Sequence, residues 1–285
     1  MKILQVPEGL RRKALEIADG LGDVLIDCEA CYGACDLCIS EAKILGCDGI
    51  IHYGHSKLIE SDVPVEYKEI RENYNPLPVL EKDFGKIGGE KIGLVSTVQF
   101  LDSLKPAKDF LERKGKKVKI GKGKINAGQV LGCDVTTAKA IQDEVDSFLF
   151  IGSGKFHPLG VAMATIKPVF VLDIEKNEIY ELDKSKFEKQ KYAAIALAKD
   201  AKKFGLLVSV KPGQMNLELA KKLKKGLESK GKKAYILIFN EIKPEKLLGL
   251  ELDCYINTTC PRIAIENRFE FKKPILNPNE IESFI

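Results

Sequence analysis

The chain has 285 residues, of which 45% are hydrophobic and 30% are charged, as in an ordinary globular protein. Its formal net charge of +4 comes from 45 basic and 41 acidic residues mixed along the chain, too weak a bias to indicate nucleic-acid binding. No apolar run approaches the ~18 residues that a membrane helix needs, and the N-terminal stretch is not a signal peptide. We therefore expect a cytoplasmic protein that binds neither membranes nor, directly, nucleic acids.

The chain runs three times through one unit of alternating strands and helices. Each unit opens with an apolar strand, expected at residues 2–6, 90–96 and 204–210. A helical stretch follows, and then a second strand, expected at residues 23–27, 116–121 and 232–239. This alternation indicates right-handed crossover connections and parallel sheets.

The third strand of each unit has a shared frame, in "DGIIHYGHS", "DSFLFIGSG" and "DCYINTTCP". Each of these segments starts with Asp, continues with apolar residues and ends in small or polar residues. A short segment of one residue, a proline and apolar residues follows each of them. We expect an α/β protein of three similar small domains with parallel sheets, at residues 1–88, 89–184 and 185–285, arranged around a pseudo-threefold axis. A single doubly wound domain is the alternative.

Three local features lie in the second half of the chain. Residues 169–183 predict a hairpin that turns near Asn177. The next 22 residues, 184–205, predict a long helix capped by Gly205. Leu219, Leu223 and Leu227 are spaced as on the buried face of an amphipathic helix.

One cysteine of each unit lies beyond the end of a strand: Cys35, Cys133 and Cys260. Ligands of open parallel sheets bind beyond the carboxyl ends of the strands. If three such loops converge, three thiolates can hold three irons of an iron–sulfur cluster and leave the fourth iron open. Cys35 and Cys133 follow second strands, whereas Cys260 follows a third strand.

The stretch "CEACYGACDLC" allows a competing site, because it holds four of the eight cysteines. Cys31, Cys35 and Cys38 have the spacing of the usual radical-SAM loop and could bind a cluster by themselves. A structural zinc on these residues and Cys28 is disfavoured, because zinc ribbons separate their cysteine pairs by roughly 15–20 residues.

The other reactive side chains of the chain have structural interpretations as well. Cys47 and Cys254 lie at an expected helix end and strand start, where core packing is the better explanation. The histidines of "HYGHS" and "FHPLG" lie on the ligand-binding edge but could equally be satisfied by local hydrogen bonds.

Six motifs occur in order along nearly the whole chain: "CYGACD", "DGIIHYGHS", "GQVLGCD", "GSGKFHPLG", "KPGQ" and "NTTCPRIAIE". With them the chain resembles the archaeal diphthamide-biosynthesis enzymes, the 2-(3-amino-3-carboxypropyl)histidine synthases. The resemblance implies that Cys35, Cys133 and Cys260 are the ligands of a [4Fe–4S] cluster, and that the match of Cys31 and Cys38 to radical-SAM spacing is a coincidence.

The resemblance also implies the reaction. The reduced cluster binds S-adenosylmethionine and cleaves the bond from sulfur to the methionine γ-carbon, and the resulting 3-amino-3-carboxypropyl radical adds to C2 of a histidine of translation elongation factor 2. This is the first step of diphthamide biosynthesis. The implied partners are this elongation factor, an electron donor that remains to be identified and a second copy of the chain in a homodimer.

Contacts to S-adenosylmethionine are assigned as hypotheses from position at the strand ends; the residues are Gln99, Ser153, Gly213, Gln214 and Arg262. Arg262 could pair with the substrate carboxylate.

Two other functions compete with this transferase. Quinolinate synthase, a dehydrating condensation enzyme, has the same plan of three α/β domains that each give one cysteine to a cluster. A non-enzymatic iron–sulfur scaffold or electron carrier would hold a cluster without cleaving S-adenosylmethionine. Formation of methylthioadenosine or of quinolinate distinguishes the first two.

Overall fold

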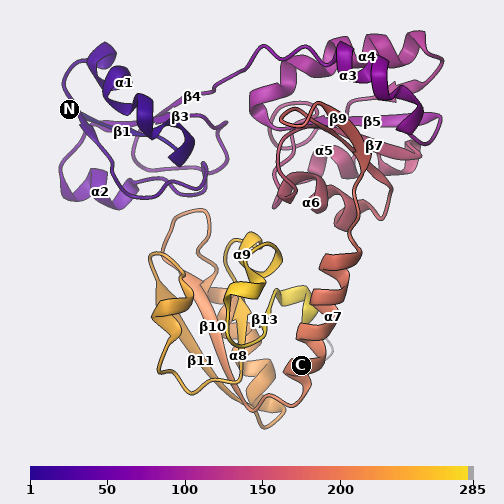
Figure 1. Cartoon of the computed structure of the whole chain (residues 1–285). Coiled ribbons are helices and arrows are strands. Elements are labelled where there is room, and N and C mark those ends of the chain that lie inside the picture. The colour runs from indigo at the N-terminus through magenta and orange to yellow at the C-terminus, as the bar shows by residue number, and fades with distance from the viewer. Residues whose placement is uncertain (282–285) are drawn as a thin grey trace. The chain divides into compact units, whose positions relative to one another are not determined.

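The computed structural model describes residues 1–281 and contains three β-sheets with helices packed on them (Figure 1). The first sheet has the order β2-β1-β3-β4 and is parallel throughout. Its strands are β1 (Lys2–Gln5), β2 (Val24–Ile26), β3 (Gly49–Tyr53) and β4 (Val65–Lys68). Helix α1 (Ala14–Leu21) packs with Leu4 and Ile51 on one face, and α2 (Ile39–Ile44) packs with Ile3 and Ile50 on the other.

The second sheet has the order β6-β5-β7-β8-β9. Its strands are β5 (Lys91–Ser96), β6 (Lys117–Lys119), β7 (Ser147–Gly152), β8 (Val169–Asp173) and β9 (Glu178–Glu181). Its helices are α3 (Leu77–Asp83), α4 (Leu104–Arg113), α5 (Thr136–Lys139) and α6 (Phe156–Thr165). Only β9 is antiparallel among these strands, and the turn from β8 to β9 contains Asn177 with φ 53°, so the predicted hairpin is confirmed.

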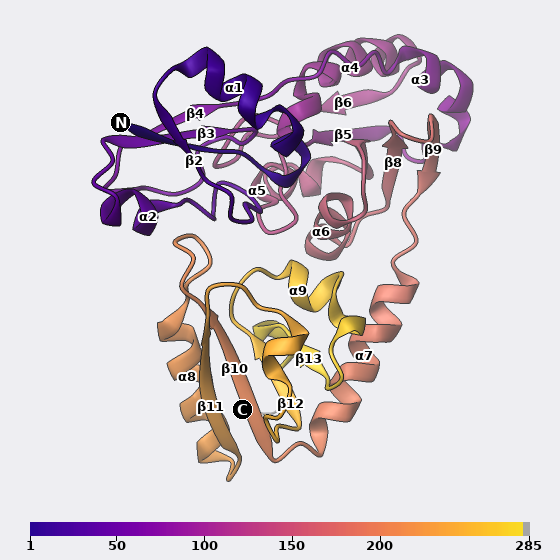
Figure 2. The same ribbon diagram turned by 60° about the vertical axis from the view of Figure 1, so that its left-hand side comes forward.

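The third sheet has the order β11-β10-β12-β13 and is parallel (Figure 2). Its strands are β10 (Lys203–Ser209), β11 (Lys233–Phe239), β12 (Cys254–Asn257) and β13 (Ile275–Leu276). Its helices are α7 (Ser185–Lys199), α8 (Leu217–Ser229) and α9 (Arg262–Ile265). Leu223 and Leu227 of α8 are buried against this sheet and Leu219 is partly buried, which confirms the predicted amphipathic face.

The three sheets share one strand order, in which the first strand of each unit lies between the second and the third. The predicted α/β class with three similar, mainly parallel sheets is therefore confirmed. The chain divides into two compact units, Met1–Leu182 with the first two sheets and Asp183–Ile285 with the third. The domain limits at residues 88 and 184 and the pseudo-threefold arrangement stay predictions.

The shared Asp of the three third strands has a structural explanation. Asp48, Asp146 and Asp253 each precede a third strand, and each carboxylate reaches the start of the neighbouring first strand. Their partners are the N-terminal ammonium of Met1 for Asp48, the N–H groups of Glu90 and Lys91 for Asp146, and those of Lys202 and Lys203 for Asp253. The carboxylate thus fixes the register in which the first and third strands begin.

The prediction that Gly205 caps a long helix is wrong. Helix α7 ends at Lys199, and Gly205 lies inside β10, opposite Tyr235 and Tyr255. A Cβ atom at residue 205 would come within 2.8 Å of Leu252, so close packing explains this glycine. Within residues 1–281 we find no helix that combines the length and the apolar character needed to cross a bilayer.

Candidate functional site

The cysteine loops lie at the carboxyl edge of their sheets, as predicted. Cys35 follows β2, Cys133 lies between β6 and α5, and Cys260 follows β12. Cys35 and Cys260 are half-buried and Cys133 is exposed. None of the eight cysteines, which all lie in the described part of the chain, forms a disulfide.

The loop that carries Cys35 is held by backbone and amide contacts rather than by regular structure. The N–H of Asp36 donates to the carbonyl of Gly33 at 2.9 Å, which makes a tight turn around Cys35. The Asp36 carboxylate accepts from the N–H of Tyr32 at 3.2 Å, and its carbonyl accepts from Nε2 of Gln5 at 3.0 Å. Because Gln5 ends β1, the turn around Cys35 is tied to the sheet.

The other cysteines of this loop have different surroundings. Cys38 is 4% exposed and packs in an apolar core beside Ile3 and Ile50, and burial raises the pKa of its thiol strongly. Cys31 is 2% exposed, and burial raises the pKa of its thiol to about 12. A thiol packed in an apolar core, as that of Cys38 is, is a poor ligand, since the thiolate is the form that binds metal. The surroundings of Cys38 therefore count against a cluster held by Cys31, Cys35 and Cys38.

Cys133 lies at the tip of a two-residue turn. Leu131 and Asp134 exchange both backbone hydrogen bonds, at 2.7 and 3.2 Å, and enclose Gly132 and Cys133. A Cβ atom on Gly132 would lie 2.2 Å from the ring of Phe156, so only glycine allows the turn to sit this close to α6. The glycine of the "LGC" motif therefore places the cysteine.

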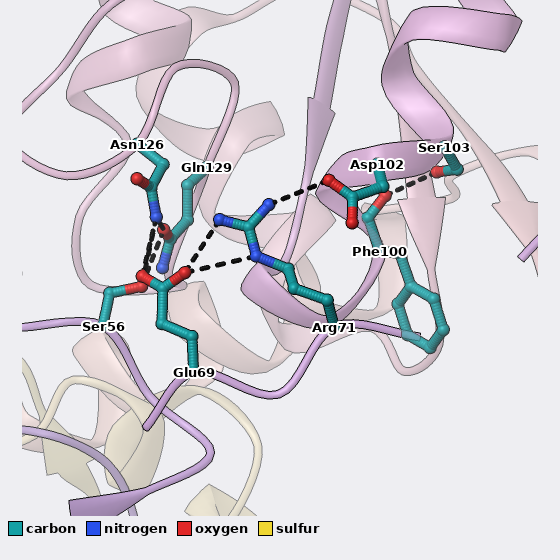
Figure 3. A network of polar contacts seen from close by, with 8 residues as sticks. All are labelled: Ser56, Glu69, Arg71, Phe100, Asp102, Ser103, Asn126 and Gln129. Atoms are coloured by element: carbon teal, nitrogen blue, oxygen red, sulfur yellow. Dashed lines mark hydrogen bonds and ion pairs between the residues drawn. The ribbon is translucent and has the colours of Figure 1, made fainter. Parts of the chain in front are cut away.

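A polar network, buried at Ser56 and Gln129, joins the loop before Cys133 to the segment after β3 (Figure 3). Gln129 pairs with Ser96 at the end of β5, and its Oε1 accepts from Ser56 Oγ at 3.0 Å and from Nδ2 of Asn126 at 2.9 Å. Nδ2 of Asn126 also donates to Glu69, which itself pairs with Arg71. Two sheet edges within the first compact unit are thereby connected.

Cys260 is positioned by two asparagines. Nδ2 of Asn257, at the end of β12, donates to the carbonyl of Cys260 at 2.8 Å and to Oδ1 of Asn277 at 2.9 Å. Asn277 is held in turn by Glu280, whose Oε2 accepts from its N–H at 2.8 Å. Arg268 donates to both oxygens of Glu280 at 2.8 Å, and both side chains are largely buried.

The histidines of "HYGHS" form a hydrogen-bonded pair. Nε2 of His52 lies 3.0 Å from Nδ1 of His55. Burial lowers the pKa of His52 to about 3 and that of His55 to about 4, so both rings are neutral near pH 7. His157 stacks on Phe150 with ring centroids 6.3 Å apart.

The residues assigned to S-adenosylmethionine all lie after strand ends. Gln99 belongs to the 3₁₀ turn Val98–Ser103 that follows β5, and Ser153 follows β7 directly. Gly213 and Gln214 lie in the turn after β10. Arg262 begins α9, and its Nε pairs with Glu266 at 2.5 Å. Their contact with the cofactor stays a prediction.

Sequence reasoning missed the residues that hold the cysteine loops, chiefly Gln5, Asp36, Asn257 and Asn277. One signal was available, because Gln5 and Asn257 are polar residues that directly follow apolar residues at the carboxyl ends of their strands. Asp36 and Asn277 had no such signal.

Residues 6–285 match the family model for diphthamide synthesis proteins. The chain belongs to the diphthamide synthesis family. It is 39% identical to the 2-(3-amino-3-carboxypropyl)histidine synthase of Pyrococcus horikoshii, over 98% of this chain and 84% of that protein. It is 30% identical to the enzyme of the same name from Methanocaldococcus jannaschii, over 99% of this chain and 84% of that protein.

A crystal structure in the diphthamide synthesis family is also close to this chain. The Dph2 protein of Pyrococcus horikoshii, whose crystal structure contains a 4Fe-4S cluster, matches with a TM-score of 0.93 and 39% identity over 99% of this chain and 85% of that chain. The family predicted from the six motifs is thus confirmed, and its named members are transferases rather than quinolinate synthases.

Proposed function

We propose that this chain transfers the 3-amino-3-carboxypropyl group of S-adenosylmethionine to C2 of a histidine of translation elongation factor 2, the first step of diphthamide biosynthesis. The observation that carries the proposal is 39% identity, over 98% of the chain, to a 2-(3-amino-3-carboxypropyl)histidine synthase. Cys35, Cys133 and Cys260 lie in three of the motifs by which the chain resembles this family, "CYGACD", "GQVLGCD" and "NTTCPRIAIE".

These three cysteines fit a [4Fe–4S] cluster by the chemistry of their surroundings. Each lies on a loop at the carboxyl edge of a parallel sheet, and none of them is packed in an apolar core as Cys38 and Cys254 are. Three thiolates leave one iron open, and the related Dph2 protein holds a 4Fe-4S cluster. When bound, the cluster supplies the electron that cleaves the sulfonium.

The protein's own part is to bind and orient S-adenosylmethionine. Arg262 is half-exposed at the start of α9, and a guanidinium can hold the carboxylate of the methionine moiety by two parallel hydrogen bonds. This requires Arg262 to exchange Glu266 for the substrate. Gln99, Ser153, Gly213 and Gln214 supply further polar groups or close backbone approach at strand ends.

The remaining components follow from the same assignment. The substrate is a protein that presents a histidine, the electron donor is a separate reductant, and the chain acts as a cytoplasmic homodimer. None of these steps requires a membrane or a nucleic acid.

The test is an anaerobic reaction of the cluster-loaded protein with S-adenosylmethionine, dithionite and elongation factor 2. We expect methylthioadenosine as the nucleoside product and one 3-amino-3-carboxypropyl group on the target histidine, located by peptide mass spectrometry. Elongation factor with that histidine changed to Ala is the matched control and should stay unmodified.

Two outcomes would refute the proposal. Quinolinate formation from small metabolites would identify the competing condensation enzyme. A reducible cluster that leaves S-adenosylmethionine intact would identify an iron–sulfur scaffold.

A further inference from the structure

Three side chains that could hold a metal ion come together where the loop that carries Cys35 meets β3. One ligand atom each of Cys31, His52 and His55 lies within 4.8 Å of the other two. Cys31 belongs to the loop after β2, His52 to β3, and His55 to the turn after β3. Cys31 and His52 are 2% and 0% exposed, so the group is built into the domain. The proposed transferase chemistry does not use it.

The orientation of the His52 imidazole is fixed by a hydrogen bond with Gln5. Nε2 of Gln5 donates to Oδ2 of Asp27 and to the carbonyl of Asp36, both at 3.0 Å, which leaves Oε1 of Gln5 to accept a hydrogen bond. That oxygen lies 2.9 Å from Nδ1 of His52. His52 therefore carries its proton on Nδ1 and presents the lone pair of Nε2. Metal-binding histidines are typically supported in this way through their other ring nitrogen.

The lone pair of His52 points into the group. Nε2 of His52 lies 3.0 Å from Nδ1 of His55. Two nitrogen ligands of a tetrahedral metal with bonds of about 2.0–2.1 Å are about 3.3 Å apart, so an ion could replace the proton between the rings after a small shift. His55 would then carry its ring proton on Nε2.

We propose that Cys31, His52 and His55 form a mononuclear binding site for a divalent transition metal of the zinc class, separate from the iron–sulfur ligands. Two imidazoles and one thiolate favour zinc over magnesium or calcium, and three protein ligands leave a fourth position for water. The Cys31 thiol releases its proton to solvent when the metal binds.

The site would hold the loop that carries Cys35. Cys31 lies four residues before Cys35, and a metal shared with β3 would anchor the loop to the first sheet at a second point besides Gln5. The proposal stands whether or not the proposed transferase function is correct.

Cobalt(II) titration of the cluster-loaded protein under anaerobic conditions tests the site. We expect one cobalt ion per chain, a thiolate-to-cobalt charge-transfer band, the visible absorption of tetrahedral cobalt, and displacement by zinc. Cys31→Ser and His55→Gln should each weaken cobalt binding at least tenfold. Cys28→Ser, at an exposed cysteine of the same loop, should bind like the parent protein.

Iron and sulfide are counted before and after the titration. Cobalt binding accompanied by loss of cluster iron would place the metal on the cluster ligands and overturn the proposal. Absence of a thiolate band, or an unchanged band in Cys31→Ser, would overturn it as well. If Cys31→Ser loses iron through misfolding, His55→Gln at a half-buried position decides the question by the same titration.

Discussion

Ser56 Oγ donates a hydrogen bond of 3.0 Å to Oε1 of Gln129, although the two residues are 73 positions apart in the chain (Figure 3). Ser56 follows the His55 turn, and Gln129 precedes the Cys133 turn. Both side chains are buried, with 5% and 3% of their surface exposed. The contact thus connects the histidine pair of the first sheet to the cysteine turn of the second.

Removal of this hydrogen bond should weaken the connection without unfolding the protein. Asn126 still donates to Gln129 in Ser56→Ala, so we expect a loss of about 1 kcal/mol in the free energy of unfolding. Gln129→Ala should cost more, and the double variant should cost less than the sum. Urea denaturation measures all three. Strict additivity would contradict a direct contact, and Ser229→Ala, at an exposed position of α8, is the control.

The turn of Cys133 should not tolerate a side chain at residue 132. Gly132→Ala places a methyl group against the ring of Phe156, and such overpacking costs about 1–3 kcal/mol. Because Cys133 is the next residue, we also expect a lower iron content after anaerobic reconstitution. The control is Gly20→Ala in α1, where an added Cβ meets nothing within 4 Å. Equal iron in both variants would show that the glycine does not position the cysteine.

The buried ion pair of the third sheet should be essential for the position of Cys260. Glu280→Ala leaves the Arg268 charge buried without its carboxylate, which costs about 3–5 kcal/mol. It also removes the acceptor that holds Asn277. We expect a lower urea midpoint and loss of iron. Glu218→Ala breaks an exposed pair with Lys221 and should cost less than about 1 kcal/mol. Similar losses in both variants would contradict this account.

The carboxylates that align the first and third strands should give the protein an acid-sensitive stability. Backbone N–H groups of Lys91 and Glu90 lower the pKa of Asp146, and those of Lys202 and Lys203 lower the pKa of Asp253. As the pH falls, the unfolded chain therefore binds protons at these two carboxylates before the folded chain does. The stabilisation that the two carboxylates provide is complete above the unfolded pKa of about 3.9, and it is lost as the pH falls through the lower folded values.

The double variant Asp146→Asn with Asp253→Asn tests this. We expect a lower Tm at pH 7 and a shallower fall of Tm below about pH 4, measured by circular dichroism. Asp143→Asn, at an exposed residue between α5 and β7, should keep the parent profile. A double variant that matches the parent at pH 7 would show that the two carboxylates do not stabilise the strand starts.

The sequence was sufficient for the fold class and for the succession of strands and helices, because short apolar runs bounded by polar or turn residues recur at the same points of each unit. It did not predict the order of the strands within each sheet. The error at Gly205 has a physical cause: a glycine after a lysine-rich helical pattern resembles a helix cap, whereas packing against Leu252 requires a glycine within the strand. Local patterns carry no information about such a contact 47 residues away.

The candidate site likewise has one part that the sequence predicts and one part that it does not. The positions of Cys35, Cys133 and Cys260 follow from motifs and strand ends, but their supports come from distant residues. Gln5 is 31 residues from Asp36, and Asn257 is 20 residues from Asn277. The grouping of Cys31 with His52 and His55 likewise depends on β3 lying beside β1 in the folded sheet.

The central claim is that one cysteine from each third of the chain holds a single [4Fe–4S] cluster. The most direct measurement is the iron and sulfide content of single Cys→Ala variants after anaerobic purification. We expect Cys35→Ala, Cys133→Ala and Cys260→Ala to lose the cluster, and Cys31→Ala and Cys38→Ala to retain it. Retained iron in Cys133→Ala together with lost iron in Cys38→Ala would contradict the claim and place the cluster on the Cys28–Cys38 loop.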